Sequence, residues 1–539
     1  MNNKKQNGSY YTPTIIADFI VKRVFDTRHY SLPANLNVLE PSAGDGVFVK
    51  SLLEHAPDDK RIKLEMVEKA KKELDKAVAT VKQLKAGRVT VNPFSQDYLQ
   101  FQSKYNKKYD LIIGNPPYIK KGHLTERQLK ICESIHKKAE LSDKRIKNIW
   151  TAFLVSAVNS LTPEGILCFV LPGELLQVSY AKELRDYLST KLTKIEIFAF
   201  NELVFDGIDQ DVIILMGTKS SKKKGVSFFH ANKLIDLKKP DLIPGNTNID
   251  RKTLDKWTNF ILSQEELVFL DGFKNKLKAV NDYSTSQVGI VTAANEYFIL
   301  SENHVNEFGL RRYCKQILQK SSLLPPCLKI QSKDFTKIKK AGKPAFLLAL
   351  EDVPINSFPA KVRRYIELGV KKKLHAGYKC ALRDNWFQVP SVWVSEGLFV
   401  KRSNQFPRII VNKAGLNVTD AFYRITMKKG YTISDLAFSF LNSLTFIFAE
   451  LEGRFYGGGV LELIPNEFKN IPIPYVKIKS KQFDRVDKML RRKEPISKIL
   501  KYTDEIILKK SLKLSRAECN KIQNIYLRLV NRRLKACKK

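Results

Sequence analysis

Between residues 36 and 218, short apolar runs alternate with amphipathic stretches. The apolar runs predict seven strands, at residues 36–40, 62–68, 88–92, 109–115, 166–172, 194–200 and 211–217. The segments between them, such as 70–84 and 148–161, are amphipathic and predict helices. Strand and helix in alternation are typical of a doubly wound, mostly parallel α/β sheet with helices on both faces. Ligands of such sheets bind at the carboxyl ends of the strands.

The regular alternation stops after residue 218. Residues 219–225 are polar and basic, which is typical of a linker or an exposed loop. Short strands, turns and helices are mixed beyond them, so we expect a first domain at 1–225 and a second, α+β region at 226–539. Residues 496–539 hold 13 lysines and arginines against 3 acids and predict a terminal helix with one basic face. Its packed face would contain Ile522, Ile525, Tyr526, Leu529 and Leu534.

The 539-residue chain is strongly basic. Its 93 lysines and arginines against 55 acids give a net charge of +38, which predicts a polyanionic partner such as nucleic acid. No apolar run reaches the roughly 18 residues that a membrane span needs, and residues 1–9 are polar, so we expect a cytoplasmic protein without a membrane partner. The 7 cysteines form no C-x-x-C pair and the histidines are scattered, so we expect no metal site.

Four unusual residues, Asn115-Pro116-Pro117-Tyr118, follow the apolar run that ends at Gly114. Two consecutive prolines can neither continue a strand ladder nor enter a helix interior, so the backbone there is stiff. An amide and an aromatic ring flank the prolines. This combination offers hydrogen-bond acceptors and a flat apolar face, which suits a planar base that carries an amino group.

Acidic or glycine-bearing segments also follow the first three predicted strands. Residues 40–48 form a loop of small residues that leads into a helix near Val47, and such a loop lets a ligand approach the backbone. The spacing is not G-x-G-x-x-G, which disfavours a dinucleotide site. At the end of the second strand, either Glu68 or Glu65 can accept hydrogen bonds from a ribose diol. After the third strand, Asp97-Tyr98 can receive the exocyclic amine of an adenine ring.

Together these motifs resemble the class I S-adenosylmethionine-dependent methyltransferases, and specifically the gamma-class adenine-amino DNA methyltransferases of restriction-modification systems. The resemblance covers about residues 8–220 in the motif order of that class: Tyr10-Tyr11-Thr12-Pro13, residues 40–48, Asp97-Tyr98 and Asn115-Pro116-Pro117-Tyr118. More loosely, residues 289–295, 454–459 and 471–474 resemble later family segments. Ala293 stands where the family more often has glycine.

The resemblance implies a catalytic domain at 1–225, a target-recognition region at 226–539, and S-adenosylmethionine as cofactor. Asn115, Pro116, Pro117 and Tyr118 would hold a flipped adenine of double-stranded DNA, which Tyr118 and Phe205 would sandwich. No strong base is needed, because orientation and electrostatic placement carry the methyl transfer. The cofactor-binding residues would be Tyr11, Thr12, Glu40, Ala43, Gly44, Gly46, Glu68, Asp97 and Tyr98.

Further expectations concern partners. Aromatic and basic residues at 378–390, among them Arg383, Trp386 and Phe387, are candidates for DNA contact or for ordinary packing. We expect a monomer that modifies DNA without cutting it, alongside a restriction endonuclease encoded separately. Two alternatives remain open: a methyltransferase that uses the same loop on ribosomal RNA or on a release factor, and a modification subunit that acts only within a larger defence complex.

Overall fold

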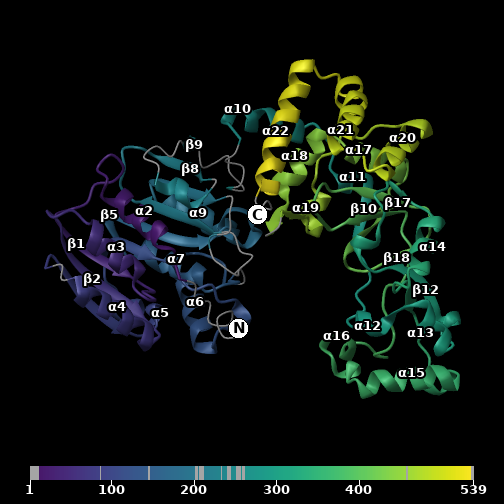
Figure 1. Cartoon of the computed structure of the whole chain (residues 1–539), viewed down its shortest axis with the longest axis horizontal. Helices are drawn as coiled ribbons and strands as arrows, with labels where there is room; N and C mark the ends of the chain where they lie inside the picture. The colour runs from purple at the N-terminus through teal and green to yellow at the C-terminus, as the bar shows by residue number, and fades with distance from the viewer. Residues whose placement is uncertain are drawn as a thin grey trace. The chain divides into compact units, whose positions relative to one another are not determined.

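The computed structural model describes residues 11–84, 87–143, 146–200, 204, 212–231, 233–238, 244–249, 257, 262–456 and 459–535. The chain divides into two compact units. The first contains the chain as far as Val268, and the second contains most of the chain from Phe269 to Asn531. Figure 1 shows the first unit in purple to blue and the second in teal, green and yellow.

A sheet in the order β3-β2-β1-β4-β5-β7-β6-β8-β9 forms the described part of the first unit (Figure 1). β7 is antiparallel to β5 and β6, and β9 is antiparallel to β8, whereas the remaining neighbours are parallel. The strands are β1 (Asn35–Glu40), β2 (Arg61–Glu68), β3 (Val89–Ser95), β4 (Tyr109–Gly114), β5 (Leu161–Pro172), β6 (Lys194–Phe200), β7 (Val212–Thr218), β8 (Gly225–Ala231) and β9 (Pro244–Ile249).

All the strands predicted from the apolar runs are present as β1 to β7, but the predicted strand count and domain boundary need correction. β8 and β9 extend the described sheet to nine strands. Residues 219–225 are therefore not a linker between domains; they form the mostly exposed loop that connects β7 to β8. The first unit ends near Val268 and not at residue 225, because β8 pairs along its whole length with β6.

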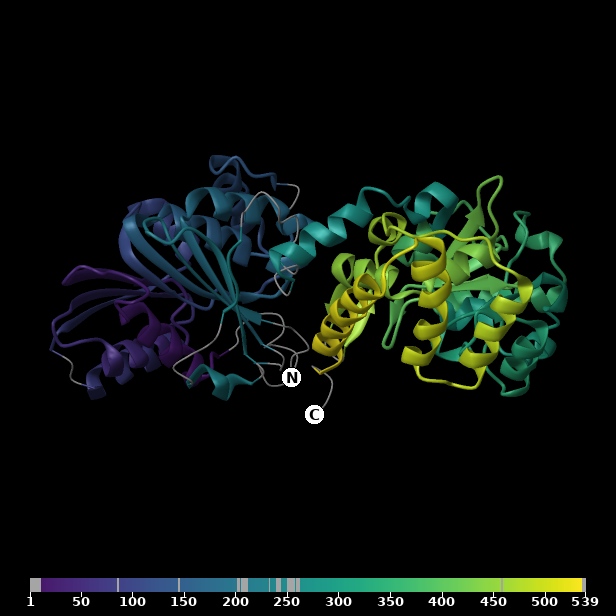
Figure 2. The same cartoon turned by 90° about the horizontal axis from the view of Figure 1, so that it is seen from above.

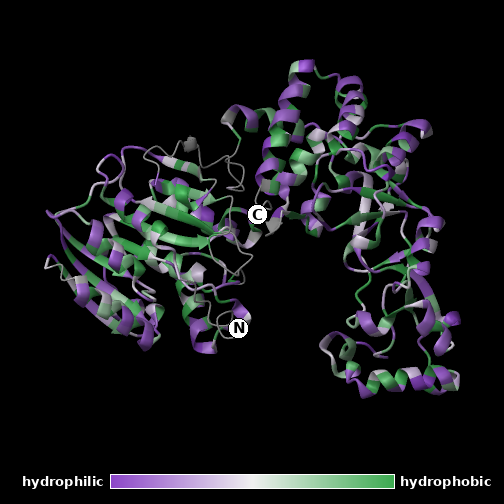
Figure 3. Ribbon diagram, viewed as in Figure 1, coloured by the Kyte–Doolittle hydropathy of each residue, from purple (hydrophilic) through white to green (hydrophobic). Residues whose placement is uncertain are grey.

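Two series of helices pack on the sheet, as expected for a doubly wound fold. The first series is α2 (Thr14–Phe25), α3 (Val47–His55) and α4 (Lys71–Leu84). The second is α5 (Tyr98–Tyr105), α6 (Glu126–Lys138), α7 (Trp150–Asn159) and α9 (Lys182–Lys191). α7 is apolar on every side and is buried from Trp150 to Val158. Figure 3 shows the strands of this sheet mainly in green, whereas many of the helices around it carry hydrophilic positions.

The second unit contains most of three further sheets. The largest has the order β10-β19-β15-β17-β13, the next β11-β14-β12-β18, and the smallest β16-β21-β20, with β16 (Arg402–Ser403), β20 (Arg454–Tyr456) and β21 (Val460–Glu462). Their bounds are β10 (Ser284–Val288), β11 (Ile299–Leu300), β12 (Cys314–Leu318), β13 (Lys329–Ile330), β14 (Phe346–Leu348), β15 (Gly397–Val400), β17 (Ile409–Asn412), β18 (Asn417–Val418) and β19 (Phe422–Met427). Phe298, Leu347 and Phe387 are among the side chains of one apolar core in this unit. Phe387 is therefore a packing residue and does not contact DNA in this conformation.

The segment after β10 adopts a turn that glycine would form more easily. Ala293 has φ = +69°, a left-handed conformation that costs an L-residue roughly 1–2 kcal/mol. Arg383 supports the turn by donating hydrogen bonds to the carbonyls of Val291 (3.3 Å) and Thr292 (2.8 Å). A left-handed turn residue is therefore present at this position although it is not glycine. Arg383, a sequence-based candidate for DNA contact, is engaged inside the unit.

The predicted C-terminal helix is α22 (Arg516–Lys535), the last helix of the chain and drawn in yellow in Figure 2; α20 (Ser480–Arg491) and α21 (Ile496–Asp504) precede it. Its predicted face is packed: Ile522, Ile525, Tyr526 and Leu529 are buried, and Leu534 is half-buried. Within the described ranges, no single helix is long and apolar enough to cross a membrane. The bent pair α17 (Ile433–Phe440) and α18 (Ser443–Glu452) passes that test only by length and composition, and its residues are mostly buried.

Candidate active site

The loops after β1 and β4 approach each other closely. β1 and β4 are parallel neighbours, with Val38 opposite Leu111 and Leu39 opposite Ile112. Their carboxyl ends, Glu40 and Gly114, therefore lie at one edge of the sheet. A Cβ atom at Gly114 would lie 3.3 Å from Cδ of Pro41, so the glycine permits the tight approach of the two loops. This contact brings residues 40–48 beside Asn115-Pro116-Pro117-Tyr118.

Two hydrogen bonds join three of the sequence motifs at Asn115. The hydroxyl of Ser42 donates to the backbone carbonyl of Asn115 at 3.0 Å. The side-chain Nδ2 of Asn115 donates to Oγ1 of Thr12 at 3.2 Å, across 103 positions of sequence. Thr12 is itself buried. Asn115 is half-buried, and its carboxamide is fixed with the nitrogen toward Thr12.

Glu40 is the most unusual acid in this region. Its side chain is 0% exposed, and neither carboxylate oxygen has a hydrogen-bond partner among the described residues. Burial raises the pKa of Glu40 well above 4.5, and the neighbouring carboxylates of Glu68 and Asp45 raise it further. A buried acid without a partner is costly to the fold, so such a residue suggests a missing cationic or hydrogen-bonding ligand.

The two glycines of the 40–48 loop differ in function. Gly46 has φ = +85°, and a Cβ there would lie 2.8 Å from Cβ of Ala77 on α4. Gly46 is thus required by backbone conformation and helix packing. Gly44 has φ = +54°, but a Cβ there would meet nothing within 4 Å. Gly44 therefore faces open space, where a ligand could approach the backbone. Ala43, which precedes Gly44, is buried, and its N–H donates to the carbonyl of Val67 at 3.2 Å.

The structure separates the two acids that compete for the ribose role. Glu65 is buried within β2, where Tyr109 OH (2.7 Å) and Lys107 Nζ (2.6 Å) donate to its two carboxylate oxygens. Glu68 ends β2 and accepts from the N–H of Gly44 at 3.1 Å and from the N–H of Ala70 at 2.8 Å. Glu68 is therefore the acid beside the open loop, and Glu65 is an internal structural acid.

Asp97 and Tyr98 form the start of α5. Asp97 is the N-cap, and its Oδ1 accepts from the N–H of Leu99 at 3.0 Å, while its Oδ2 accepts from Nε2 of Gln128 at 3.2 Å. Tyr98 is buried, its ring packs against Phe153, and its hydroxyl accepts from Ser156 Oγ at 3.2 Å. The side chain of Tyr98 is therefore a core element, and only its backbone stands at the strand end.

Of the two aromatic residues expected to stack on a base, the structure describes only Tyr118. Tyr118 is 7% exposed, and its hydroxyl donates to the carbonyl of Val170 at 3.1 Å. A base stacked on Tyr118 would have to meet the small part of the ring that is exposed. Phe205 lies outside the described residues. Pro116 is buried and Pro117 is half-buried, so the loop has one accessible side.

Tyr11 is 45% exposed and stands near the same loops. Desolvation raises the pKa of Tyr11, and a hydrogen bond to Glu73 of α4 raises it further; Asp45 and Lys76 also interact with it. Glu73 was not predicted from the sequence. The hydrophilic positions of the predicted helix 70–84 gave no signal that one of them would meet Tyr11.

One possible ligand cluster was also missed. Among the described residues, Asp18, Glu54 and His55 place ligand atoms within 4.8 Å of one another. Asp18 accepts from Ser51 Oγ at 2.9 Å and lies 3.3 Å from Nε2 of His55. The cluster was invisible in the sequence because Asp18 comes from α2 whereas Glu54 and His55 come from α3. Its members are partly exposed and already interact with one another, so we assign it no metal.

The described residues fit S-adenosylmethionine, the cofactor implied by the resemblance. That molecule carries a sulfonium and an ammonium cation, and a cation beside the buried, unpartnered carboxyl group of Glu40 would favour its ionised form. Gly44 leaves space beside the loop, and Glu68 stands at the next strand end, where a ribose diol binds in sheets of this kind. When bound, the cofactor supplies an electrophilic methyl group.

Comparisons with known proteins agree with this arrangement. Residues 39–205 match the family model of the Eco57I restriction-modification methylase. Residues 254–508 match the model of the C-terminal domain of the type II methyltransferase M.Eco57I. The type II methyltransferase M.AccI of Acinetobacter calcoaceticus is 25% identical over 503 residues, which cover 87% of this chain and 85% of that protein. M.HincII of Haemophilus influenzae is 24% identical over 340 residues, which cover 57% and 60% of the two chains.

A solved structure supports the fold. A nuclease-deletion mutant of the type ISP restriction-modification enzyme LlaGI superposes with a TM-score of 0.51 at 14% identity. The match covers 90% of this chain but 54% of that one, so the chain spans about half the length of the larger enzyme. Both units of the chain thus match methyltransferases of restriction-modification systems, which supports a DNA methyltransferase of that kind with S-adenosylmethionine as its cofactor.

Proposed function

We propose that the chain transfers a methyl group from S-adenosylmethionine to the exocyclic amine of an adenine that is flipped out of double-stranded DNA. The observation that carries this proposal is the position of Asn115, which two hydrogen bonds tie to Thr12 and Ser42 at the edge where Glu40 and Gly44 face the cofactor site. The motif order, the relatives named above and the net charge of +38 also support it.

The chemistry needs orientation more than a base. The lone pair of the adenine amine is delocalised into the ring, so the amine is a poor nucleophile. Hydrogen bonds from the amine to Oδ1 of Asn115 and to the carbonyl of Pro116 would favour a pyramidal nitrogen, whose lone pair can point at the methyl group. The nitrogen then loses a proton after attack. Fixed acceptors supply this alignment without reorganisation at the moment of reaction.

The fixed carboxamide of Asn115 contributes to that alignment. Because Nδ2 donates to Thr12, the carboxamide oxygen is directed away from Thr12, and this oxygen is buried from solvent. Extrusion of the base costs a few kcal/mol, and stacking on aromatic rings returns about 1–3 kcal/mol per base. Tyr118 and Phe205 are the rings that we propose for this stacking. A separately encoded restriction endonuclease would cut DNA that lacks the methyl mark.

Replacement of Asn115 tests the assignment. Asn115→Ala should lower the rate of methyl transfer by about 10²–10³-fold or more, because it removes one fixed acceptor, while binding of S-adenosylmethionine changes little. The purified chain is incubated with duplex DNA and labelled cofactor, and the modified nucleoside is identified by mass spectrometry. Asn159→Ala, at an exposed position of the same unit, is the matched control and should retain activity.

The product decides among the alternatives. N6-methyladenine in DNA supports the proposal, whereas methylation of a cytosine, of ribosomal RNA or of a release-factor glutamine would contradict it. Activity that appears only after a cell extract is added would favour a subunit of a larger complex. Equal loss of methyl transfer and cofactor affinity in Asn115→Ala would contradict the role given to this residue.

A further inference from the structure

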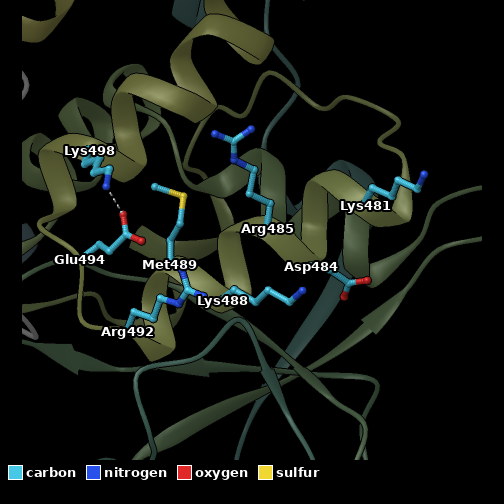
Figure 4. Close-up of a pocket in the computed structure, with 8 residues that line it drawn as sticks. All are labelled: Lys481, Asp484, Arg485, Lys488, Met489, Arg492, Glu494 and Lys498. Atoms are coloured by element: carbon cyan, nitrogen blue, oxygen red, sulfur yellow. Dashed lines mark ion pairs between the residues drawn. The ribbon is translucent and has the colours of Figure 1, made fainter.

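A stripe of four exposed cations runs along one face of α20. Lys481, Arg485, Lys488 and Arg492 follow one another at intervals of four, three and four residues, so they lie on one side of the helix and its C-cap. All four side chains are exposed. Figure 4 shows them around a hollow, with Lys481 at one end and Arg492 toward the other. At about 1.5 Å per residue the stripe is roughly 16 Å long.

The acids of the same helix are neutralised by the interior of the unit and not by the stripe. Asp487 is buried and accepts from the N–H groups of Leu328 (2.8 Å) and Lys329 (3.1 Å), as well as from Nε of Arg491 at 2.8 Å. Asp484 pairs with Nζ of Lys329 at 2.6 Å. Within the part of the chain that the structure describes, Lys481, Lys488 and Arg492 form no ion pair with a carboxylate. Their charge is left for an external anion.

The stripe rests on a rigid support. Val486, Leu490 and Phe483 on the opposite face of α20 are buried. Arg491 also donates to both carboxylate oxygens of Asp334, at 2.9 and 3.0 Å, which fixes α20 to α14 (Ser332–Lys340). Arg485 lies over the ring of Tyr502 on α21 at 4.4 Å from its centroid. A helix held in this way presents its cations at fixed positions, so little ordering entropy is lost on binding.

The hollow itself is basic. It has a volume of about 470 Å³ and is lined by the four cations of the stripe with Lys498, Asp484, Glu494 and Met489. Both lining acids are engaged: Asp484 with Lys329, and Glu494 with Nζ of Lys498 at 2.9 Å. Because the acids are neutralised pairwise, the unbalanced charge of the hollow comes from Lys481, Arg485, Lys488 and Arg492.

We propose that this hollow, the α20 groove, binds the phosphate backbone of duplex DNA independently of base sequence. The proposal rests on the proposed function, which makes DNA the polyanion that the chain must hold. Phosphates along one strand advance by about 3.4 Å of helix axis per nucleotide. A stripe of roughly 16 Å therefore spans about four to five phosphate steps, enough for each of its cations to contact one phosphate. Apart from Met489 and two paired acids, the lining consists of exposed cations, so we expect it to contact phosphate oxygens, which position DNA without selecting a sequence.

The paired change Lys488→Gln with Arg492→Gln tests the groove. Counterion release gives about 0.9 units of salt slope for each phosphate contact. The slope of log K against log [salt] should therefore fall by about 2, and affinity at 0.1 M salt should fall by at least about tenfold. The measurement is fluorescence anisotropy with the full-length chain at several salt concentrations, on two duplexes of unrelated sequence. Both duplexes should lose the same factor.

The matched control is Lys333→Gln with Lys337→Gln on α14. These two lysines are also exposed and one helical turn apart, and their replacement removes the same charge, but they do not line the hollow. The control pair should retain the wild-type slope. Circular dichroism and thermal unfolding establish that both paired variants are folded.

Three outcomes would overturn the proposal: an unchanged salt slope in the groove variant, an equal loss in the control variant, or a loss confined to one DNA sequence. The wild-type chain is assayed for its methylated nucleoside separately. An absent or different product in that assay would refute the proposed function, whereas the salt slope addresses the groove alone.

Discussion

Two buried glutamates in the sheet of the first unit, Glu196 and Glu40, have pKa values shifted in opposite directions. Glu196 on β6 accepts from Nε (3.0 Å) and Nη2 (2.9 Å) of Arg23 and from the hydroxyl of Tyr30 at 2.7 Å, and it lies 3.2 Å from Nζ of Lys194. Glu40 on β1 has no hydrogen-bond partner among the described residues. Burial raises the pKa of both, but at Glu196 the hydrogen bonds and attraction of Arg23 prevail and lower it to about 2.

The difference shows how a structural acid is told from a functional one. Both side chains are almost completely buried, so burial does not separate them. Glu196 belongs to a network of residues of the fold itself, and both of its carboxylate oxygens accept hydrogen bonds. Burial of Glu40 without a partner lowers the stability of the fold, and a ligand that bonded to its carboxyl group would offset this loss. The contrast assigns Glu196 to stability and supports the proposed role of Glu40 in binding.

Loss of Glu196 should have the largest effect on stability. Glu196→Gln leaves Arg23 and Lys194 buried without a counter-charge, and breaking such a pair costs about 3–5 kcal/mol. The free energy of unfolding is measured by urea denaturation, with Glu164→Gln at an exposed position as the control. A loss as small as that of the control would contradict the structural role of Glu196, because Glu196 would then not hold the network together.

The pH dependence of the same residue has a definite sign. The pKa of Glu196 is lowered from 4.5 to about 2 in the folded state. Its contribution to stability is therefore fully present above pH 4.5 and is lost as the pH falls toward 2. The stability gap between wild type and Glu196→Gln should close over this interval. A gap that does not narrow on acidification would contradict the assignment.

The two loop glycines show the same contrast between a structural position and a proposed binding position. Gly46→Ala combines a left-handed φ with a clash against Ala77 and should cost roughly 2–4 kcal/mol of stability. Gly44→Ala meets no neighbour, so it should cost only about 1 kcal/mol of stability while weakening cofactor binding. Thermal unfolding and isothermal titration with S-adenosylmethionine separate the two effects. Equal stability losses would mean that the space beside Gly44 is not kept for a ligand.

Replacement of Glu40 should change stability as little as Gly44→Ala does, but in the opposite direction. Glu40→Gln removes a buried ionisable group and should leave the chain about 1 kcal/mol more stable at pH 7, yet it should weaken cofactor binding. Because the pKa of Glu40 is raised in the folded state, wild-type stability falls as the pH rises above 4.5, whereas the variant avoids this loss. The gain should therefore vanish near pH 4.5. A destabilised variant at pH 7 would contradict the distinction from Glu196.

Much of the first unit could be predicted from the sequence because its strands are continuous apolar runs. β8 and β9 were missed, since they follow a basic loop and β8 pairs with β6, a partner that is not its neighbour in sequence. Asn115, Gly44 and Glu68 were predicted because their residue types are unusual directly after a strand, and the structure brings their loops to one edge of the sheet. The packing of the Tyr98 ring against Phe153 could not be predicted, because residue type does not decide the direction of a ring.

The other features that could not be predicted from the sequence depend on contacts between residues far apart in the chain. The hydrogen bond from Asn115 to Thr12 spans 103 positions, so the residues near either one do not predict it. The turn at Ala293 forms because Arg383, about 90 positions later in the chain, donates to the carbonyls beside it. The α20 groove depends on which acids the interior neutralises, and composition alone cannot distinguish a paired aspartate from a solvated one.

The extension of the sheet by β8 has a practical consequence for work with fragments. A protein truncated at residue 225 would lose the strand that pairs with β6 from Lys194 to Phe200. The row of amide and carbonyl groups on β6 would then be bare, and such an edge promotes aggregation. A soluble catalytic fragment should therefore extend at least to Val268, where the first unit ends.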